Sequence, residues 1–269
     1  MKRVMSVATS DSGAGAGIQA DLKSFLRCGV YGTTAIVATT AQNTVGVNGI
    51  HALPPGVAVD QIEAVAEDIG VDAVKTGMLF NAGIISAVAD AIRRLGLPNL
   101  VVDPVMVAES GAVLLEEDAV ETYKRELFPL AAAITPNVNE AFALALPGKA
   151  VDEERIEECA RKLHELGPRA VVITGGHTAT GDDLLYDGER FTRMEGEVHS
   201  SSSTHGAGCT HSSALASFLA RGFGLEDSAR RARRVASEAV GRGLDEIGAG
   251  AGPVHALGAT LDLPEEDRP

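Results

Sequence analysis

Short β-branched segments alternate with amphipathic segments along nearly the whole chain. Most of these short segments end in glycine or polar turn residues before helical periodicity begins. The expected strands span residues 3–8, 32–39, 72–76, 100–103, 132–135 and 170–174. Strands that alternate with helices form a mostly parallel sheet, because each crossover places a helix on a face of the sheet. The sequence therefore predicts a three-layer α/β/α sandwich.

The expected helices carry apolar residues at intervals of three and four. Ile18, Leu22, Phe25 and Leu26 would share the buried face of the first helix. Asn81 is expected to cap the helix that follows it. The other helical segments span residues 57–69, 81–95, 116–128, 152–166, 209–221 and 225–244, with one more opening near residue 137. Residues 183–186 and 190–194 predict a β-hairpin.

The chain of 269 residues is long enough for one large domain or two small ones. It contains no linker of domain-separating length and no internal repeat. We therefore expect a single domain over residues 1–262 and a polar tail over residues 263–269.

The formal net charge of −14 argues against nucleic acid as the main partner. No apolar run reaches the length of a membrane span, and the first residues lack the apolar core of a signal peptide. The three cysteines, Cys28, Cys159 and Cys209, are odd in number and have no metal-ligand spacing. These features predict a cytoplasmic protein that binds neither nucleic acid nor membranes and has no disulfide framework.

The turn Gly206-Ala207-Gly208 runs directly into an expected helix. Glycines allow successive N–H groups to point into one concavity, and the helix N-terminus adds further N–H groups and positive potential. This combination suits a phosphate or a developing negative charge. Cys209 lies at the same helix start, where we expect its pKa to be lowered.

A second glycine-rich segment, with Gly13, Gly15 and Gly17, follows the first expected strand. Its spacing is not G-x-G-x-x-G, and no acidic residue closes a second strand at the expected distance. A dinucleotide-binding fold is therefore not supported.

Several other polar or small residues directly follow expected strands. They are Asp11, Gln42, Met78, Asp103, Asn137, Glu140 and Gly176. In an open parallel sheet the carboxyl ends of the strands face one crevice. We expect a two-part cleft. The loops in the N-terminal part of the chain would contact the small molecule, and the loops in the C-terminal part would contact the phosphates.

The ordered set of motifs resembles the hydroxymethylpyrimidine kinase/phosphomethylpyrimidine kinase family of thiamine biosynthesis, which has a ribokinase-like fold. The matching segments are residues 10–23, 41–44, 75–79, 102–106, 134–137, 175–177 and 204–210. The resemblance implies ATP-dependent phosphorylation of hydroxymethylpyrimidine and then of its monophosphate. It also implies Mg²⁺ as a cofactor and a homo-oligomer, most simply a homodimer.

The resemblance further implies roles for individual residues. Gln42 would hydrogen-bond the aminopyrimidine, with Asp21, Met78 and Gly13 also at the substrate. The anion hole would consist of Gly206, Ala207, Gly208 and Cys209, with Cys209 as the catalytic base. The nucleotide would contact Asn137, Glu140, Thr174, Gly176 and Thr204. Asp103 and Glu140 would bind the Mg²⁺ ion.

Three positions depart from the family pattern. Thr174 replaces a lysine that family members often have, which removes one positive charge from the expected ATP site. Ser203 stands where asparagine is often found. Both departures affect the expected contacts with the nucleotide and not those with the pyrimidine. Ala207 replaces a threonine that is common in the family. The expected contribution of this position to the anion hole is its backbone N–H, which alanine retains.

Two other functions fit the same residues. A pyridoxal kinase or another small-alcohol kinase would share the anion hole. It would differ only in the substrate pocket that the loops after the N-terminal strands form. A catalytically idle protein could bind the pyrimidine phosphate as a regulator.

The remaining charged and titratable side chains are expected to have structural roles. The spacing of His177, His205 and His211 suits no metal site. The basic cluster Arg230, Arg231, Arg233 and Arg234 is expected to form a solvated helix face.

Overall fold

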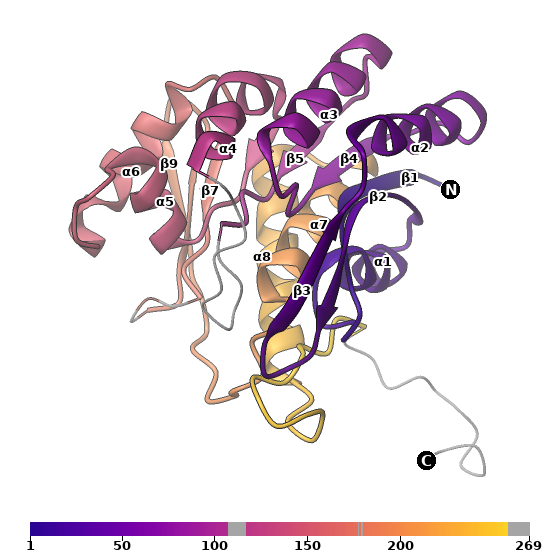
Figure 1. Cartoon of the computed structure of the whole chain (residues 1–269). Helices are drawn as coiled ribbons and strands as arrows, with labels where there is room; N and C mark the ends of the chain where they lie inside the picture. The colour runs from indigo at the N-terminus through magenta and orange to yellow at the C-terminus, as the bar shows by residue number, and fades with distance from the viewer. Residues whose placement is uncertain (107–116, 177, 179, 258–269) are drawn as a thin grey trace.

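The computed structural model describes residues 1–106, 117–176, 178 and 180–257. The predicted tail over residues 263–269 and His177 lie outside the described residues. Within the described ranges, nine strands form one sheet in the order β3-β2-β1-β4-β5-β6-β7-β8-β9 (Figure 1). In the same part of the chain, no helix has both the length and the apolar character needed to cross a membrane.

The strands are mostly those that the sequence predicts. They are β1 (Arg3–Asp11), β2 (Tyr31–Gln42), β3 (Val47–Ala52), β4 (Ala73–Thr76), β5 (Leu100–Val102), β6 (Ala133–Ile134), β7 (Val171–Ile173), β8 (Asp183–Tyr186) and β9 (Phe191–Met194). The run from β2 to β7 is parallel, whereas β3, β8 and β9 pair antiparallel. This sheet confirms the predicted mostly parallel α/β architecture, and β8 with β9 confirms the predicted hairpin.

Eight α-helices occur within the described residues. They are α1 (Gly17–Arg27), α2 (Pro55–Asp68), α3 (Ala82–Leu95), α4 (Glu117–Thr122), α5 (Val138–Ala145), α6 (Ile156–His164), α7 (Ala207–Ala220) and α8 (Leu225–Gly241). The predicted helix 116–128 continues beyond α4 as a π-turn and a 3-10 turn, and the predicted helix 152–166 begins with a 3-10 turn before α6. Asn81 caps α3 as predicted, since its side chain accepts a hydrogen bond from the Ile84 N–H.

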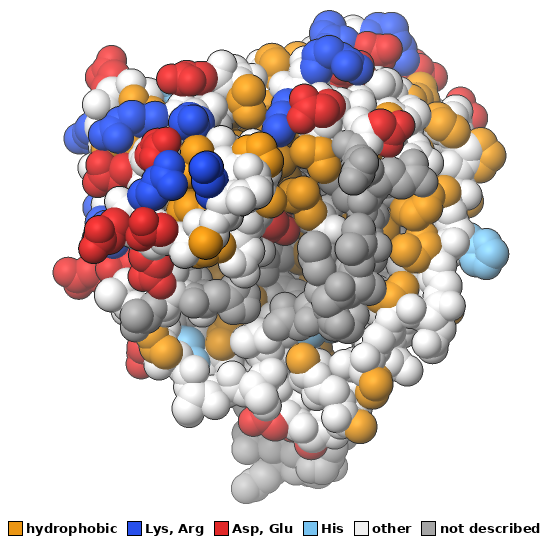
Figure 2. All heavy atoms as spheres, turned by 60° about the vertical axis from the view of Figure 1, so that its left-hand side comes forward, with side chains coloured by type: hydrophobic (Ala, Val, Ile, Leu, Met, Phe, Trp, Pro, Cys, Tyr) orange, Lys and Arg blue, Asp and Glu red, His pale blue; other side chains and the backbone are white. Residues whose placement is uncertain are grey.

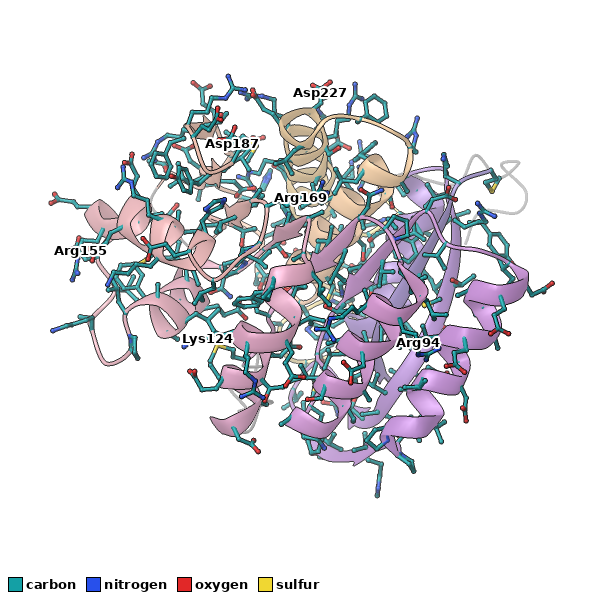
Figure 3. The ribbon with its side chains drawn as sticks, turned by 90° about the horizontal axis from the view of Figure 1, so that it is seen from above. Arg94, Lys124, Arg155, Arg169, Asp187 and Asp227 are labelled. Carbon is teal, nitrogen blue, oxygen red and sulfur yellow. The ribbon has the colours of Figure 1, made fainter. Side chains whose placement is uncertain are left out.

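Two apolar clusters lie on opposite faces of the sheet and complete the three layers. Successive residues of a strand point to opposite faces; Met5 and Val102 therefore pack with α2, α3, α5 and α6, whereas Val4 and Val101 pack with α1, α7 and α8. Seen from above, Arg94 and Lys124 project from one helical layer and Asp227 projects from the other (Figure 3).

The outer surface mixes both signs of charge. Figure 2 shows Lys and Arg side chains among Asp and Glu side chains over one face of the molecule. On α6, for example, Arg161 pairs with Glu157 and Lys162 with Glu158.

Two predictions of local structure were wrong. In α1, Ile18 and Phe25 are buried, but Leu22 is 37% exposed and Leu26 is 70% exposed. The reason is that Asp21 and Ser24 occupy the buried face. Strand β3 was not predicted, because it is an edge strand with no buried residue and therefore lacks the apolar alternation of a core strand.

A buried ion pair explains why α1 turns a carboxylate inward. The Lys75 ammonium on β4 lies 2.8 Å from Asp21 Oδ1, and both side chains are fully buried. Ser213 on α7 donates to the same oxygen at 2.7 Å, and Ser6 on β1 donates to Asp21 Oδ2. Burial alone would lower the pKa of Lys75, but the charge of Asp21, the nearby Cys209 and Asp103 and the hydrogen bond to Asp21 together outweigh burial, so that the pKa is raised. The pair thus joins two strands and two helices.

We expect the substitution Lys75→Met to destabilise the fold by about 3–5 kcal/mol, because it leaves the Asp21 carboxylate buried without a counter-ion. The double variant Lys75→Met/Asp21→Asn should regain most of that free energy of unfolding, since neither charge remains. Urea unfolding of the three proteins tests this. Equal stability of the single and double variants would contradict the electrostatic explanation.

Candidate active site

A cavity of about 260 Å³ lies at the carboxyl ends of the parallel strands, beside the N-terminus of α7. It brings together most of the residues that the sequence analysis singled out. Those on its wall are Gln42, Met78, Asp103, Asn137, Glu140, Thr174, Gly176, Thr204, Gly206, Ala207, Gly208 and Cys209. Asp21 and Gly13 are not among its lining residues: Asp21 is buried with Lys75, and the Gly13 N–H is bonded to Asp11.

The turn before α7 has the backbone geometry that the glycines predict. Gly206 is the N-cap of α7 and has a φ of +87°. A Cβ at this position would lie 1.9 Å from the Gly15 carbonyl oxygen, so only glycine fits. The first turn of α7 contains no acidic residue. Its N–H groups and the positive end of the helix dipole therefore offer an anion site at the cavity.

The expected lowered pKa of Cys209 was wrong. Burial raises the pKa of this thiol to about 12. The positive charge of Lys75 acts in the opposite direction, but the carboxylates of Asp21 and Asp103 add to the effect of burial. The thiol form of Cys209 is therefore favoured over the thiolate in these surroundings.

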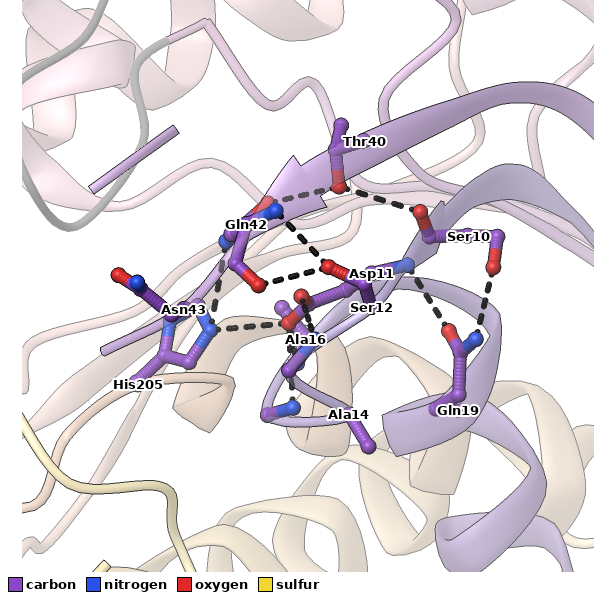
Figure 4. Close-up of polar contacts among 12 residues, drawn as sticks. Ser10, Asp11, Ser12, Ala14, Ala16, Gln19, Thr40, Gln42, Asn43 and His205 are labelled. Atoms are coloured by element: carbon purple, nitrogen blue, oxygen red, sulfur yellow. Dashed lines mark hydrogen bonds and ion pairs between the residues drawn. The ribbon is translucent and has the colours of Figure 1, made fainter. Parts of the chain in front are cut away.

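The Asp11 carboxylate accepts hydrogen bonds from backbone N–H groups of the glycine-rich segment (Figure 4). Its Oδ1 accepts the Gly13 N–H at 2.8 Å, and its Oδ2 accepts those of Gly15 at 3.1 Å and Ala16 at 2.9 Å. His205 Nε2 lies 3.1 Å from the same Oδ2. Burial would raise the pKa of Asp11, but these hydrogen bonds together lower it. The N–H groups of this loop are therefore directed at a protein carboxylate, which agrees with the rejection of a dinucleotide site.

Gln42 presents its side-chain amide to the cavity. The Thr40 hydroxyl donates to Gln42 Oε1 at 3.1 Å, and Gln42 Nε2 lies 3.4 Å from His205 Nε2. Ser12 fixes the backbone, because it accepts the Gln42 N–H at 2.8 Å and donates to the Gln42 carbonyl at 2.7 Å. Both the position and the orientation of this amide are thus set by neighbouring side chains (Figure 4).

Asp103 and Glu140 form an acidic wall of the cavity. Glu140 is in a capping box with Asn137, in which each accepts the other's backbone N–H at 2.9 Å. Burial, followed by the charge of Asp103, raises the pKa of Glu140 to about 8. Burial likewise raises the pKa of Asp103, to which Ser212 donates at 2.9 Å.

This acidic wall fits a divalent cation. Two buried carboxylates with raised pKa values lack enough positive charge around them, and Mg²⁺ commonly binds one or two carboxylates together with substrate phosphates. Within the described ranges, no group of three or more His, Cys, Asp or Glu side chains could hold a metal by itself. A cation here would therefore need oxygen ligands from a bound phosphate.

Ser203 does not lie on the cavity wall. It is fully buried, and its hydroxyl donates to Asp245 Oδ1 at 2.5 Å. A Cβ on Gly243 would lie 2.3 Å from Ser203 Cβ, so the space around this residue is already filled. The departure from the family pattern at this position is accommodated by local packing.

The sequence analysis missed four charged residues at this site. Lys75, Asp183 and Glu197 line the cavity, and so does Arg233 from α8, which corrects the expectation that the basic cluster is a wholly solvated face. Lys75 appeared in the sequence analysis only as the first residue of the matching segment 75–79. No local pattern distinguishes Asp183 or Arg233 from surface charges, because their partners are distant in sequence.

The sequence profile of the phosphomethylpyrimidine kinase family matches residues 11–255. The chain belongs to this family. It is 48% identical over 262 residues to the thiamine biosynthesis bifunctional protein ThiED of Geobacter sulfurreducens, with 97% of this chain and 53% of that protein covered. It thus spans about half the length of that relative. It is also 43% identical to the hydroxymethylpyrimidine/phosphomethylpyrimidine kinase of Bacillus subtilis, with 94% of each chain covered.

Solved structures confirm the predicted ribokinase-like architecture. The pyridoxal kinase from Staphylococcus aureus in complex with ADP has a TM-score of 0.88 and 33% sequence identity to this chain. The match covers 97% of this chain and 96% of that one. The fold is therefore shared with a kinase named for pyridoxal.

We expect Gly15→Ala to raise the KM for the pyrimidine substrate and to lower kcat/KM by about 100-fold, because misplacing positioning residues by about 1 Å has this order of effect. The added Cβ would lie 2.1 Å from His205 Cδ2, so the imidazole must leave Asp11 and Gln42. Gly46→Ala is the control, since a Cβ there meets nothing within 4 Å. A KM in Gly15→Ala equal to that of the control would contradict this role of the histidine.

We expect wild-type stability to fall as the pH rises from about 4.5 to about 8, in part because of Glu140. Burial raises its folded-state pKa to about 8, above the 4.5 of an unperturbed glutamate. The folded state therefore binds the proton more tightly in this window, and ionisation of Glu140 destabilises it. Glu140→Gln should remove this contribution and increase stability at pH 8, while kinase activity falls. Urea unfolding at several pH values tests this, with exposed Glu67→Gln as the control. An unchanged pH profile in Glu140→Gln would refute the prediction.

Proposed function

We propose that this protein transfers the γ-phosphoryl group of ATP to the hydroxymethyl oxygen of 4-amino-5-hydroxymethyl-2-methylpyrimidine. A second transfer onto the resulting monophosphate gives the diphosphate used in thiamine biosynthesis. The observation that carries the proposal is one cavity that joins the Gln42 amide to the N-terminus of α7. Membership of the phosphomethylpyrimidine kinase family supports the same reaction.

The Gln42 amide matches one edge of an aminopyrimidine. Its carbonyl oxygen can accept a hydrogen bond from the exocyclic amino group, while its NH₂ group donates to the adjacent ring nitrogen. Met78 lies on the same cavity wall and offers apolar contact to the ring. Asp21 takes no direct part in this recognition; it acts through Lys75, which it holds beneath the pocket.

The transferred phosphoryl group lies at the first turn of α7 in this proposal. Phosphoryl transfer depends mainly on in-line positioning and neutralisation of charge. The N–H groups of Gly208 and Cys209 supply fixed donors, and Asn137, Thr174, Gly176 and Thr204 face the nucleotide side. Asp103 and Glu140 would hold Mg²⁺, which supplies positive charge to the phosphates when bound.

Cys209 accepts the proton in the first transfer. The alcohol oxygen forms a bond to the γ-phosphorus, the bond to the bridging oxygen of ADP breaks, and the alcohol proton passes to the Cys209 sulfur as thiolate. Because the pKa of the thiol is raised, only a small fraction is thiolate at neutral pH. In the second transfer the nucleophile is a phosphate oxygen that is already anionic, so no base is needed.

We also propose a cytoplasmic homodimer. Leu22, Leu26 and Tyr31 are exposed near one another where α1 meets the start of β2, which supports an apolar contact between copies. The small-molecule substrates of the proposed reaction are soluble metabolites, which supports the cytoplasm.

Phosphorus NMR of the protein with magnesium-ATP and hydroxymethylpyrimidine tests the reaction. We expect the monophosphate first and then the diphosphate, with the first rate rising between about pH 7 and about pH 9. Cys209→Ala should slow the first transfer more than the second and abolish its pH dependence. Equal loss in both steps would refute the assigned role of Cys209. Turnover of pyridoxal alone would favour the rival kinase, and magnesium-ATP left unconsumed would favour the idle regulator.

A further inference from the structure

The arginines of α8 have three different environments. Arg230 is exposed and pairs with Glu226 at 2.9 Å. Arg231 lies over the ring of Phe223, with its guanidinium carbon 4.3 Å from the ring centroid. Arg234 is exposed. Arg233 differs from them because it lines the active-site cavity with a side chain that is only 12% exposed.

Helical spacing explains why Arg233 faces inward. Ala236, Ser237 and Val240 lie three, four and seven residues after Arg233, and all four residues line the cavity. The guanidinium donates to the Gly181 carbonyl, and its Nε lies 3.7 Å from Asp183 Oδ1. Its position is therefore fixed by contacts with the segment that leads into β8.

The same Asp183 connects Arg233 to the position of the missing lysine. Asp183 is fully buried, and its Oδ1 accepts the Gly175 N–H at 2.9 Å. Gly175 directly follows Thr174, which also lines the cavity. The guanidinium of Arg233 thus lies at the end of the cavity where the family often has a lysine and this chain has threonine.

This end of the cavity has unused hydrogen-bonding capacity. Among the described residues, Arg233 Nε and His211 Nδ1 are buried without a hydrogen-bond partner. His211 is 3% exposed, and its Nε2 lies 3.2 Å from Asp183 Oδ2. Buried polar groups without partners are rare in native proteins, and a cluster of them on a cavity wall indicates a ligand that completes their bonds.

We propose that Arg233 binds phosphate oxygens of the nucleotide and supplies the positive charge that Thr174 does not. A guanidinium presents several N–H donors in a planar fork that matches phosphate geometry. Asp183 acts as a positioning residue that holds the guanidinium at this wall, and His211 adds a further hydrogen-bonding group. This inference rests on the proposed kinase function.

The test compares ADP affinity by calorimetry, and the KM for magnesium-ATP, among variants that separate charge from packing. Arg233→Gln should weaken ADP binding and raise the KM for ATP by about 10- to 100-fold, since hydrogen bonds to charged groups have this order of effect. Its KM for the pyrimidine should be unchanged. Arg233→Lys keeps the charge but loses the planar fork, so its ADP affinity should lie between those of Arg233→Gln and wild type, and Arg234→Gln should match wild type.

Equal ADP affinity in Arg233→Gln and Arg234→Gln would overturn the inference, as would equal affinity in Arg233→Gln and Arg233→Lys. The double variant Arg233→Gln/Thr174→Lys moves the charge to the family position and should bind ADP more tightly than Arg233→Gln alone. No gain in that variant would also count against the inference. A wild-type protein that bound no ADP would instead refute the proposed kinase function itself.

Discussion

The ammonium group of Lys75 is the main positive charge beneath the substrate half of the cavity, and much of the site depends on it. Asp21 lies 2.8 Å from it and Asp103 lies 3.9 Å from it. One cation therefore faces two carboxylates, while Glu140 adds a third acidic group nearby. Burial is the main reason why the pKa values of Asp103, Glu140 and Cys209 are raised, and the neighbouring carboxylates raise them further. The folded protein thus holds a site that is short of positive charge until ligands arrive.

Helix α7 separates this acidic half from the nucleotide half. Ser212 and Ser213 bond to Asp103 and Asp21, so one side of the helix faces the Lys75 cluster. His211 lies beside Asp183, four residues after Ala207 and therefore on the same side of the helix as Ala207. One helix thus presents its N-terminus to the cavity, while its two sides support different parts of the cavity wall.

The sequence predicted the architecture well because alternating strands and helices leave few ways to form a sheet. It also predicted that Gln42, Asp103 and Cys209 would meet, since each follows a strand or opens α7 at the same sheet edge. It could not predict that α1 buries Asp21, because the partner Lys75 is 54 residues away. The raised pKa of Cys209 and the inward position of Arg233 depend on groups from several elements, which no local pattern records.

The carboxylate of Asp11 has a consequence for the kinetics of ligand binding. Because it already holds the N–H groups of Gly13, Gly15 and Ala16, the glycine-rich loop is ordered before any substrate arrives. The conformational entropy of that loop is therefore lost during folding and not during association. A pre-organised loop of this kind favours rapid docking of a ligand with little rearrangement of the protein at this end of the cavity.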